Sequence, residues 1–134
     1  MASALAADGV PFGIIGLGQR GQYLLERLNR IASGRCVAVC DSDEARRRKA
    51  IQQSASNPRA HAAYREILDR KDVQAVLVAT PTYTHFSIVR DALQAGKHVF
   101  CEQPLVHKHD EVRELRKIAA AHPDQVVQVG LERR

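Results

Sequence analysis

The sequence predicts an α/β fold with a doubly wound parallel sheet, on the basis of three observations. Short, almost continuous apolar runs alternate with segments of helical periodicity, which is typical of parallel strands covered by helices on both faces. Three glycines in the pattern G-x-G-x-x-G, Gly16, Gly18 and Gly21, follow the first apolar run directly. The second apolar run ends in Asp41, which lies 20 residues after Gly21. About six strands in the order 3-2-1-4-5-6 are therefore expected.

The glycine stretch predicts a phosphate-binding turn between the first strand and the first helix. In such a turn Gly16 allows the bend, Gly18 lets the backbone approach a pyrophosphate, and Gly21 lets the helix lie close to the strand. The N–H groups and the positive dipole end of the helix then face the phosphates. The predicted cofactor-binding residues of the turn are Gly16, Leu17, Gly18, Gln19, Arg20 and Gly21. The alternative is a glycine turn in another α/β protein that binds no phosphate.

Apolar runs and breaker residues place the other elements. Strands are expected over 12–16, 36–40, 59–63, 73–79, 98–101 and 126–129. Helices are expected over 19–32, from 43 onward, and over 64–69, 84–95 and 108–121. The run 73–79 gives the strongest signal of a buried strand, whereas 59–63 is typical of a short edge strand.

Helical periodicity indicates which face of each helix is buried. The expected inward faces hold Tyr23, Leu24, Leu28 and Ile31 in the first helix, Ile88, Val89, Ala92 and Leu93 in the helix over 84–95, and Val112, Leu115, Ile118 and Ala119 in the last helix. Gly34 is expected as a left-handed cap of the first helix, and Gly96 is expected to end the helix over 84–95.

Composition favours a globular domain with an anionic ligand. Hydrophobic residues make up 45% and charged residues 26% of the 134 residues, which is ordinary for a single domain. No apolar run approaches the roughly 20 residues that span a bilayer, so no membrane segment is expected. The net charge of +5 suits an anionic cofactor or a partner domain. Because aromatic residues make up only 4% and no nucleic-acid motif is present, nucleic-acid binding is not expected.

The three cysteines are expected to be free, buried thiols. Cys36 and Cys40 lie in one predicted strand, where a rise of about 3.3 Å per residue keeps them too far apart to form a disulfide. Cys101 ends another strand, and no histidine has a ligand spacing with a cysteine, so no metal site is expected. Free thiols are typical of the cytoplasm, which is the expected location.

Four landmarks occur in order along the chain. They are the glycine turn at 16–21, Asp41, the segment Ala79-Thr80-Pro81 with His85 after it, and the stretch 96–105, which contains Glu102-Gln103-Pro104. Together they resemble the N-terminal half of the Gfo/Idh/MocA family of NAD(P)-dependent sugar and polyol dehydrogenases. The resemblance covers about 10–134 and implies a Rossmann domain that binds a nicotinamide cofactor.

The resemblance also implies how the chain is divided. It suggests a dinucleotide-binding domain over 10–130 and the start of a link to an absent substrate domain over 131–134, while the small residues at the start of the chain indicate a flexible tail over 1–9. In the family, the second domain holds the sugar-like substrate and supplies the usual catalytic histidine. The chain is then either a shortened form of such an enzyme or a lone cofactor domain. Its oligomeric state is left without a prediction.

Candidate site residues beyond the glycine turn lie at the carboxyl ends of strands, which line the ligand crevice in open α/β sheets. By resemblance, the cofactor-binding candidates are Asp41, Ser42, Ala79, Thr80, Pro81, His85, Glu102 and Gln103. The catalytic candidates are Glu102, Gln103 and His85. His85 has an alternative role, as a residue at a helix start that satisfies backbone groups. The bond between Gln103 and Pro104 is expected to be cis, as the family motif suggests.

Asp41 favours NAD over NADP. Its carboxylate would accept hydrogen bonds from both ribose hydroxyls and would repel a 2′-phosphate. The basic run from Arg46 to Lys49 acts in the opposite direction, because a nearby arginine can hold that phosphate. The same run also has an ordinary interpretation as a solvated helix face. NAD is therefore the expected cofactor, with NADP as the less favoured alternative.

Gln103 stands where the family motif has a lysine. A lysine beside the nicotinamide can donate a charged hydrogen bond and transfer a proton, whereas glutamine can only orient a hydroxyl or carbonyl. Hydride transfer between a sugar- or polyol-like alcohol and the nicotinamide is the expected function. One alternative is an NAD-dependent glycosidase, since related glycosidases also lack that lysine and 18–22 resembles their glycine turn. Another is a non-catalytic module that binds NAD(H).

Overall fold

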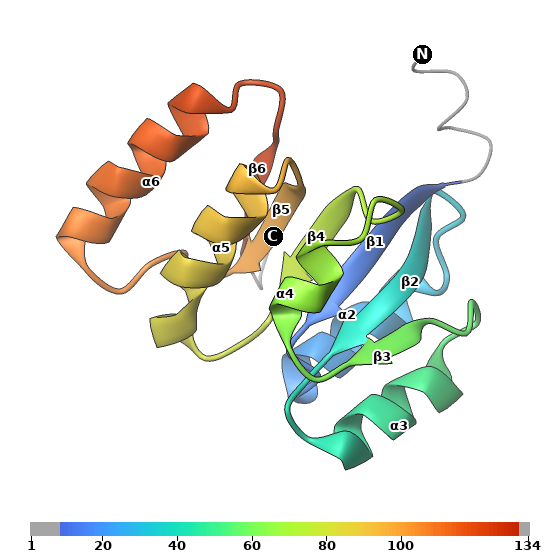
Figure 1. Cartoon of the computed structure of the whole chain (residues 1–134). Coiled ribbons are helices and arrows are strands. Elements are labelled where there is room, and N and C mark those ends of the chain that lie inside the picture. The colour runs from blue at the N-terminus through green and yellow to red at the C-terminus, as the bar shows by residue number, and fades with distance from the viewer. Residues whose placement is uncertain (1–8, 132–134) are drawn as a thin grey trace.

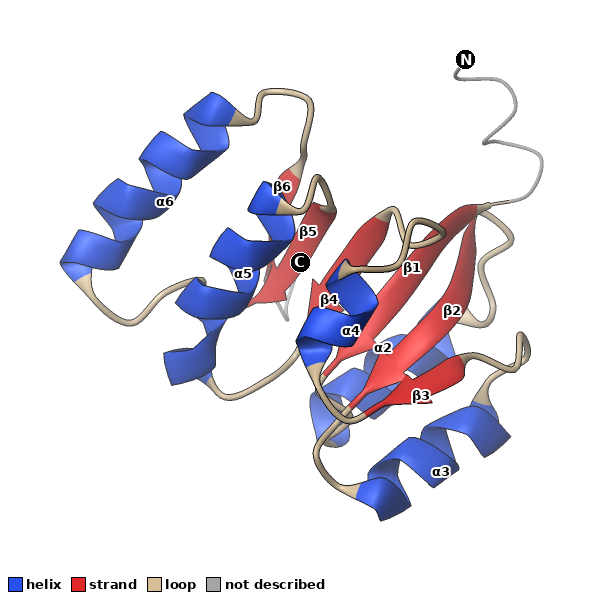
Figure 2. Cartoon of the chain, viewed as in Figure 1, coloured by secondary structure: helices blue, strands red, loops and turns tan. Residues whose placement is uncertain are grey.

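The computed structural model of the chain describes residues 9–131 and contains a six-stranded parallel sheet (Figures 1 and 2). The strands are β1 (Val10–Ile15), β2 (Gly34–Cys40), β3 (Arg59–His61), β4 (Ala75–Val78), β5 (His98–Glu102) and β6 (Val127–Gly130). They lie in the order β3-β2-β1-β4-β5-β6, so the predicted topology is confirmed. Residues 1–8 of the expected tail and 132–134 of the expected link lie outside the described residues.

Helices cover both faces of the sheet. They are α2 (Gln19–Leu28), α3 (Glu44–Gln53), α4 (Tyr64–Leu68), α5 (His85–Gln94), α6 (His109–Ala121) and a short 3₁₀ helix, η1 (Thr82–Thr84). One apolar core lies between the sheet and α4, α5 and α6, and the other between the sheet and α2 and α3. Side chains of β1 alternate between these cores, with Phe12 and Ile14 in one and Ile15 in the other. The predicted doubly wound fold is thereby confirmed.

The buried face of α2 agrees with the predicted one at Leu28 but differs from it at Tyr23 and Ile31. Gly21 and Leu25 are buried, whereas Tyr23 and Ile31 are exposed, and the helix ends at Leu28 rather than near residue 32. The position of Gly21 explains the difference, because its α-carbon lies against the backbone of the glycine turn. Residues four and seven positions further along, Leu25 and Leu28, then face the sheet. Close backbone packing therefore sets the rotation of this helix.

The prediction that Gly34 forms a left-handed cap is wrong. Gly34 is the first residue of β2, and its α-carbon packs on the ring of Phe12, where an added Cβ would lie 3.1 Å from Cε1. Turns over 29–33 connect the end of α2 to this strand. Gly96 does follow α5 as expected, with a φ of +77°. The two glycines therefore serve different purposes, one in packing and the other in ending a helix.

The predicted inward face of α5 is confirmed, because Ile88, Val89, Ala92 and Leu93 are all buried. In α6 only Leu115 is buried, while Val112 is exposed. The cysteines are free and buried, and burial raises the pKa of each thiol to about 12, which makes them poor nucleophiles. Within residues 9–131, no helix is long and apolar enough to cross a membrane.

Asp91 connects α4 to α5 through a group of polar contacts. Its carboxylate accepts hydrogen bonds from the Tyr64 hydroxyl at 2.7 Å and from Arg90 Nε at 3.0 Å, and it lies 3.1 Å from a guanidinium nitrogen of Arg65. Burial is the largest single influence and raises the pKa of Asp91. The hydrogen bonds and the two arginine charges outweigh it, so the net pKa is lower than the usual 3.8.

We expect Asp91→Asn to lower the free energy of unfolding by about 2 kcal/mol at neutral pH. In this variant the free energy of unfolding should also fall less steeply as the pH is lowered. The folded-state pKa lies below the unfolded value, so this contribution is complete above 3.8 and is lost as the pH falls through the folded-state pKa. Urea unfolding measured between about pH 5 and pH 2 tests this expectation. Asp124→Asn, at an exposed turn, is the matched control. If the free energy of unfolding falls with decreasing pH at the same rate in the wild type and in Asp91→Asn, the expectation is contradicted.

Candidate functional site

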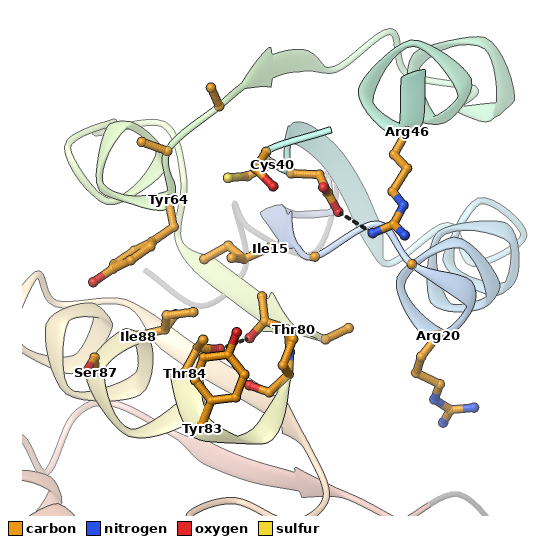
Figure 3. A pocket seen from close by; sticks show the side chains of 18 of the residues that line it. Ile15, Arg20, Cys40, Arg46, Tyr64, Thr80, Tyr83, Thr84, Ser87 and Ile88 are labelled. Carbon is orange, nitrogen blue, oxygen red and sulfur yellow. Dashed lines mark hydrogen bonds and ion pairs between the residues drawn. The ribbon is translucent and has the colours of Figure 1, made fainter. Parts of the chain in front are cut away.

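A cavity of about 840 Å³ opens at the carboxyl ends of the central strands, where β1 separates β2 from β4 (Figure 3). The strand order reverses at this position, and ligands of open α/β sheets bind in the crevice at such a point. The walls come from the ends of β1, β2 and β4, the glycine turn, the turn before α4, and η1. The volume is within the range of small-molecule and cofactor sites.

The glycines of the turn have three separate surroundings. A Cβ added to Gly21 would lie 1.9 Å from the carbonyl oxygen of Gly16. A Cβ added to Gly16 would lie 2.6 Å from the carbonyl oxygen of Ala79. At Gly18, by contrast, an added Cβ would meet nothing within 4 Å. Gly18 precedes α2 without any side-chain cap, so the first-turn N–H groups of α2 are available to a ligand. The turn is therefore closely packed against neighbouring backbone at Gly16 and Gly21 and has free space beside Gly18.

Asp41 ties the glycine turn to the start of α3. One carboxylate oxygen accepts a hydrogen bond from the backbone N–H of Leu17 at 2.8 Å, and the other accepts one from Asp43 at 2.9 Å. A carboxylate has about four acceptor positions, so two remain for a ligand. Ser42 also lines the cavity. Contact between Asp41 and a ribose stays a prediction, while its role in holding the turn is new.

The basic run of α3 separates into three different environments. Arg46 lines the cavity and extends toward Asp41, with 3.7 Å between its guanidinium nitrogen and Oδ2 (Figure 3). Arg47 turns back and donates to the carbonyl oxygens of Asp41 and Ser42, at 2.7 Å and 3.0 Å. Arg48 pairs with Glu44 on the helix surface. Of these three arginines, Arg46 is thus the one that lines the cavity.

His85 does not line this first cavity, but it is among the residues that line a second hollow beside it. Its side chain is 1% exposed, and its ring nitrogens lie 2.8 Å from the carbonyl oxygens of Thr80 and Pro104. These oxygens belong to the loops that follow β4 and β5. The geometry matches the alternative reading of His85 as a residue that satisfies backbone groups. Both ring nitrogens contact backbone oxygens in this structure, and a cofactor or catalytic contact of His85 stays a prediction.

A second hollow, of about 620 Å³, lies beside the first, between α2 and the ends of β4 and β5. Its lining residues include Ala79, Thr80, Glu102 and Gln103. Glu102 Oε1 accepts a hydrogen bond from Arg20 Nε at 2.9 Å. The peptide bond between Gln103 and Pro104 is cis, as expected. The structure therefore brings together candidates from both halves of the chain.

Several cavity residues were missed by sequence reasoning. They are Ile15, Cys40, Ala62, Ala63, Tyr64, Tyr83, Thr84, Ser87 and Ile88. The Thr84 hydroxyl donates to the Pro81 carbonyl oxygen at 2.7 Å and lies 2.6 Å from the Thr80 hydroxyl, from which it can accept, and these contacts hold the loop after β4. Ile15 and Cys40 end strands, and Ala62 and Ala63 follow one, so a systematic reading of strand ends would have found these four. Tyr83 is largely exposed at the rim of the cavity (Figure 3).

A comparison with protein families shows which family the chain belongs to. The model of the Gfo/Idh/MocA oxidoreductase family, described as an NAD-binding Rossmann fold, matches residues 10–131. This chain belongs to that family. The match covers all the elements from β1 to β6 and every candidate site residue.

Individual relatives agree with the family assignment. The chain is 41% identical over 122 residues to an inositol 2-dehydrogenase of Burkholderia multivorans, covering 90% of this chain and 36% of that protein. It is 37% identical over 116 residues to a glycosyl hydrolase family 109 protein of a Shewanella strain, covering 81% and 25%. The structure of Lactobacillus casei myo-inositol dehydrogenase with NAD(H) and myo-inositol superposes with a TM-score of 0.88 at 28% identity, covering 94% and 38%. The chain spans about a third of the length of the inositol dehydrogenases.

The residues of this Gfo/Idh/MocA chain fit the NAD cofactor of the family. The space in front of Gly18 admits a group as close to the backbone as a phosphate must come. The first turn of α2 supplies N–H donors, and Asp41 supplies acceptors at the end of β2. The cavity between them is large enough for a nucleotide. Donors and acceptors therefore occur in the order in which a dinucleotide presents phosphate and ribose.

Proposed function

We propose that this chain is the dinucleotide-binding part of an enzyme that transfers a hydride between a polyol- or sugar-like alcohol and NAD. The observation that carries the proposal is the crevice itself. The crevice contains the uncapped N-terminus of α2 at Gly18, and the carboxylate of Asp41 lies beside this helix end. The similarity to inositol 2-dehydrogenases supports the substrate class. Residues 10–130 form the cofactor domain, and 131–134 begin the connection to a part that binds the substrate.

Each part of the crevice has a proposed role. The turn 16–21 holds the pyrophosphate, Asp41 and Ser42 hold the adenosine ribose, and 79–81 contact the nicotinamide ribose. Glu102 and Gln103 face the nicotinamide and the substrate. When bound, the nicotinamide supplies the hydride chemistry. Gln103 orients a substrate hydroxyl but takes no proton from it, because an amide does not titrate at neutral pH.

A second candidate is an NAD-dependent glycosidase. Two observations favour it: the neutral Gln103 at the lysine position of the family motif, and the 37% identity to a glycosyl hydrolase family 109 protein. A free keto-sugar product from the longer protein would indicate the dehydrogenase. Release of a sugar with the cofactor regenerated would indicate the glycosidase. Binding of NAD without turnover would indicate a non-catalytic NAD(H) module.

Calorimetric titration with NAD⁺, NADH, NADP⁺ and NADPH at one ionic strength tests the cofactor assignment. We expect the plain dinucleotides to bind on the order of tenfold more tightly, because Asp41 repels a 2′-phosphate. Arg46→Gln should weaken NADP⁺ binding several-fold, since Arg46 is the arginine of the run that faces the cavity, and should leave NAD⁺ binding unchanged. Arg48→Gln removes the same charge on the outer surface and is the control. Tighter NADP⁺ binding by the wild type would contradict the role given to Asp41.

A further inference from the structure

An ion pair crosses the second hollow from α2 to the end of β5. It joins Arg20 Nε to Glu102 Oε1 at 2.9 Å, and the two side chains are 33% and 10% exposed. The pair connects residues that are 82 positions apart in the chain. It therefore bridges the glycine turn and the strand that carries the Glu-Gln-Pro segment, on the side of the crevice away from Asp41.

Both partners of this pair are held in place by their surroundings. The Arg20 guanidinium lies over the ring of Tyr23, with 4.9 Å between Cζ and the ring centroid. Glu102 packs against the backbone of Gly130 in β6, where an added Cβ would lie 3.2 Å from its carboxylate carbon. A carboxylate with so little exposure needs a cation close by, and Arg20 is its partner in the described part of the chain. The pair is thus a fixed part of the wall of the hollow.

The pair lies where the nicotinamide end of the cofactor falls if the proposed function is correct. With the adenosine ribose at Asp41 and the pyrophosphate at the start of α2, the rest of the dinucleotide extends toward Thr80 and the hollow that contains Glu102. The nicotinamide ring carries a positive charge in NAD⁺ and none in NADH. Any net charge on the wall beside it therefore changes the affinities of the two forms unequally.

We propose that the Arg20–Glu102 pair sets the balance between oxidised and reduced cofactor in this chain. This inference rests on the proposed function. The two opposite charges nearly cancel at the ring, and the neighbouring Gln103 adds none. Without Arg20, the Glu102 carboxylate attracts the charged ring of NAD⁺. Without Glu102, the Arg20 guanidinium repels that ring and favours NADH.

The test is the ratio of the NAD⁺ and NADH dissociation constants, measured by calorimetry on the full chain. Compared with the wild type, Arg20→Gln should shift this ratio toward NAD⁺ on the order of three- to tenfold, and Glu102→Gln should shift it toward NADH by a similar factor. Loss of a contact between Arg20 and the pyrophosphate would weaken both forms equally and would cancel in the ratio. Arg30→Gln removes a charge from an exposed pair with Glu26, outside the hollow, and should leave the ratio unchanged.

The double variant Arg20→Gln with Glu102→Gln should restore the wild-type ratio, because it again leaves the wall neutral. If the unpaired Glu102 prevents Arg20→Gln from folding, the double variant still allows the test. The ratio of dissociation constants in Glu102→Gln must then differ from the ratio in the double variant. Equal ratios in all folded variants would overturn the inference while leaving the proposed function intact. A wild-type chain that binds neither NAD⁺ nor NADH would overturn the proposed function and this inference together.

Discussion

Gly21→Ala is expected to lower the free energy of unfolding by about 3 kcal/mol. The added Cβ would lie 1.9 Å from the carbonyl oxygen of Gly16, and backbone atoms on both sides cannot rotate away. Relief requires α2 to move off β1, which also separates Leu25 from the core between the sheet and α2. Urea unfolding followed by circular dichroism measures the loss. An unchanged midpoint would show that α2 can shift without cost.

Gly18→Ala is the matched change in the same turn, and we expect the opposite combination of effects. The φ of −68° at Gly18 suits alanine, and an added Cβ meets nothing within 4 Å, so stability should stay within about 0.5 kcal/mol of the wild type. The methyl group points into the space that the pyrophosphate is proposed to fill, so NAD⁺ affinity should fall on the order of tenfold or more. Wild-type affinity in this variant would place the pyrophosphate elsewhere.

The features that the sequence predicted correctly are those that short segments determine by themselves. An apolar run such as 75–78 has to be buried on both faces, and the helices around it leave a parallel sheet as the arrangement that achieves this. The spacing of Gly16 and Gly21 likewise implies a close approach of strand and helix, which the structure shows. Gly96 ends α5 because a left-handed residue there breaks the helix locally.

The features that were missed depend on contacts between distant segments. Arg20 and Glu102 are 82 residues apart, so no local pattern indicates that they pair. The run of arginines in α3 looks uniform in sequence, yet Arg46 faces the cavity while Arg47 binds backbone carbonyls. The face of α2 was misjudged because hydrophobicity pointed to Tyr23, whereas the backbone contact at Gly21 fixes the helix rotation. Tertiary packing decides each of these cases.

His85→Leu is expected to lower the free energy of unfolding by about 2–4 kcal/mol and to weaken NAD⁺ binding. Leucine is similar in size but has no N–H group, so the carbonyl oxygens of Thr80 and Pro104 lose their contacts at 2.8 Å with the buried ring. These oxygens lie in the loops after β4 and β5, which form two walls of the crevice. We therefore expect His85 to act as a positioning residue, through the loops that it joins.

The measurements that separate this role from simple stabilisation are the thermal midpoint and NAD⁺ affinity, with affinity determined well below the midpoint. His109→Leu changes an exposed histidine at the start of α6 and should alter neither quantity. His85→Gln keeps an amide donor that can reach one of the carbonyls, so it should recover part of both losses. If affinity in folded His85→Leu equals that of the wild type, the ring stabilises the fold without positioning the crevice, because the loops then hold their places unaided.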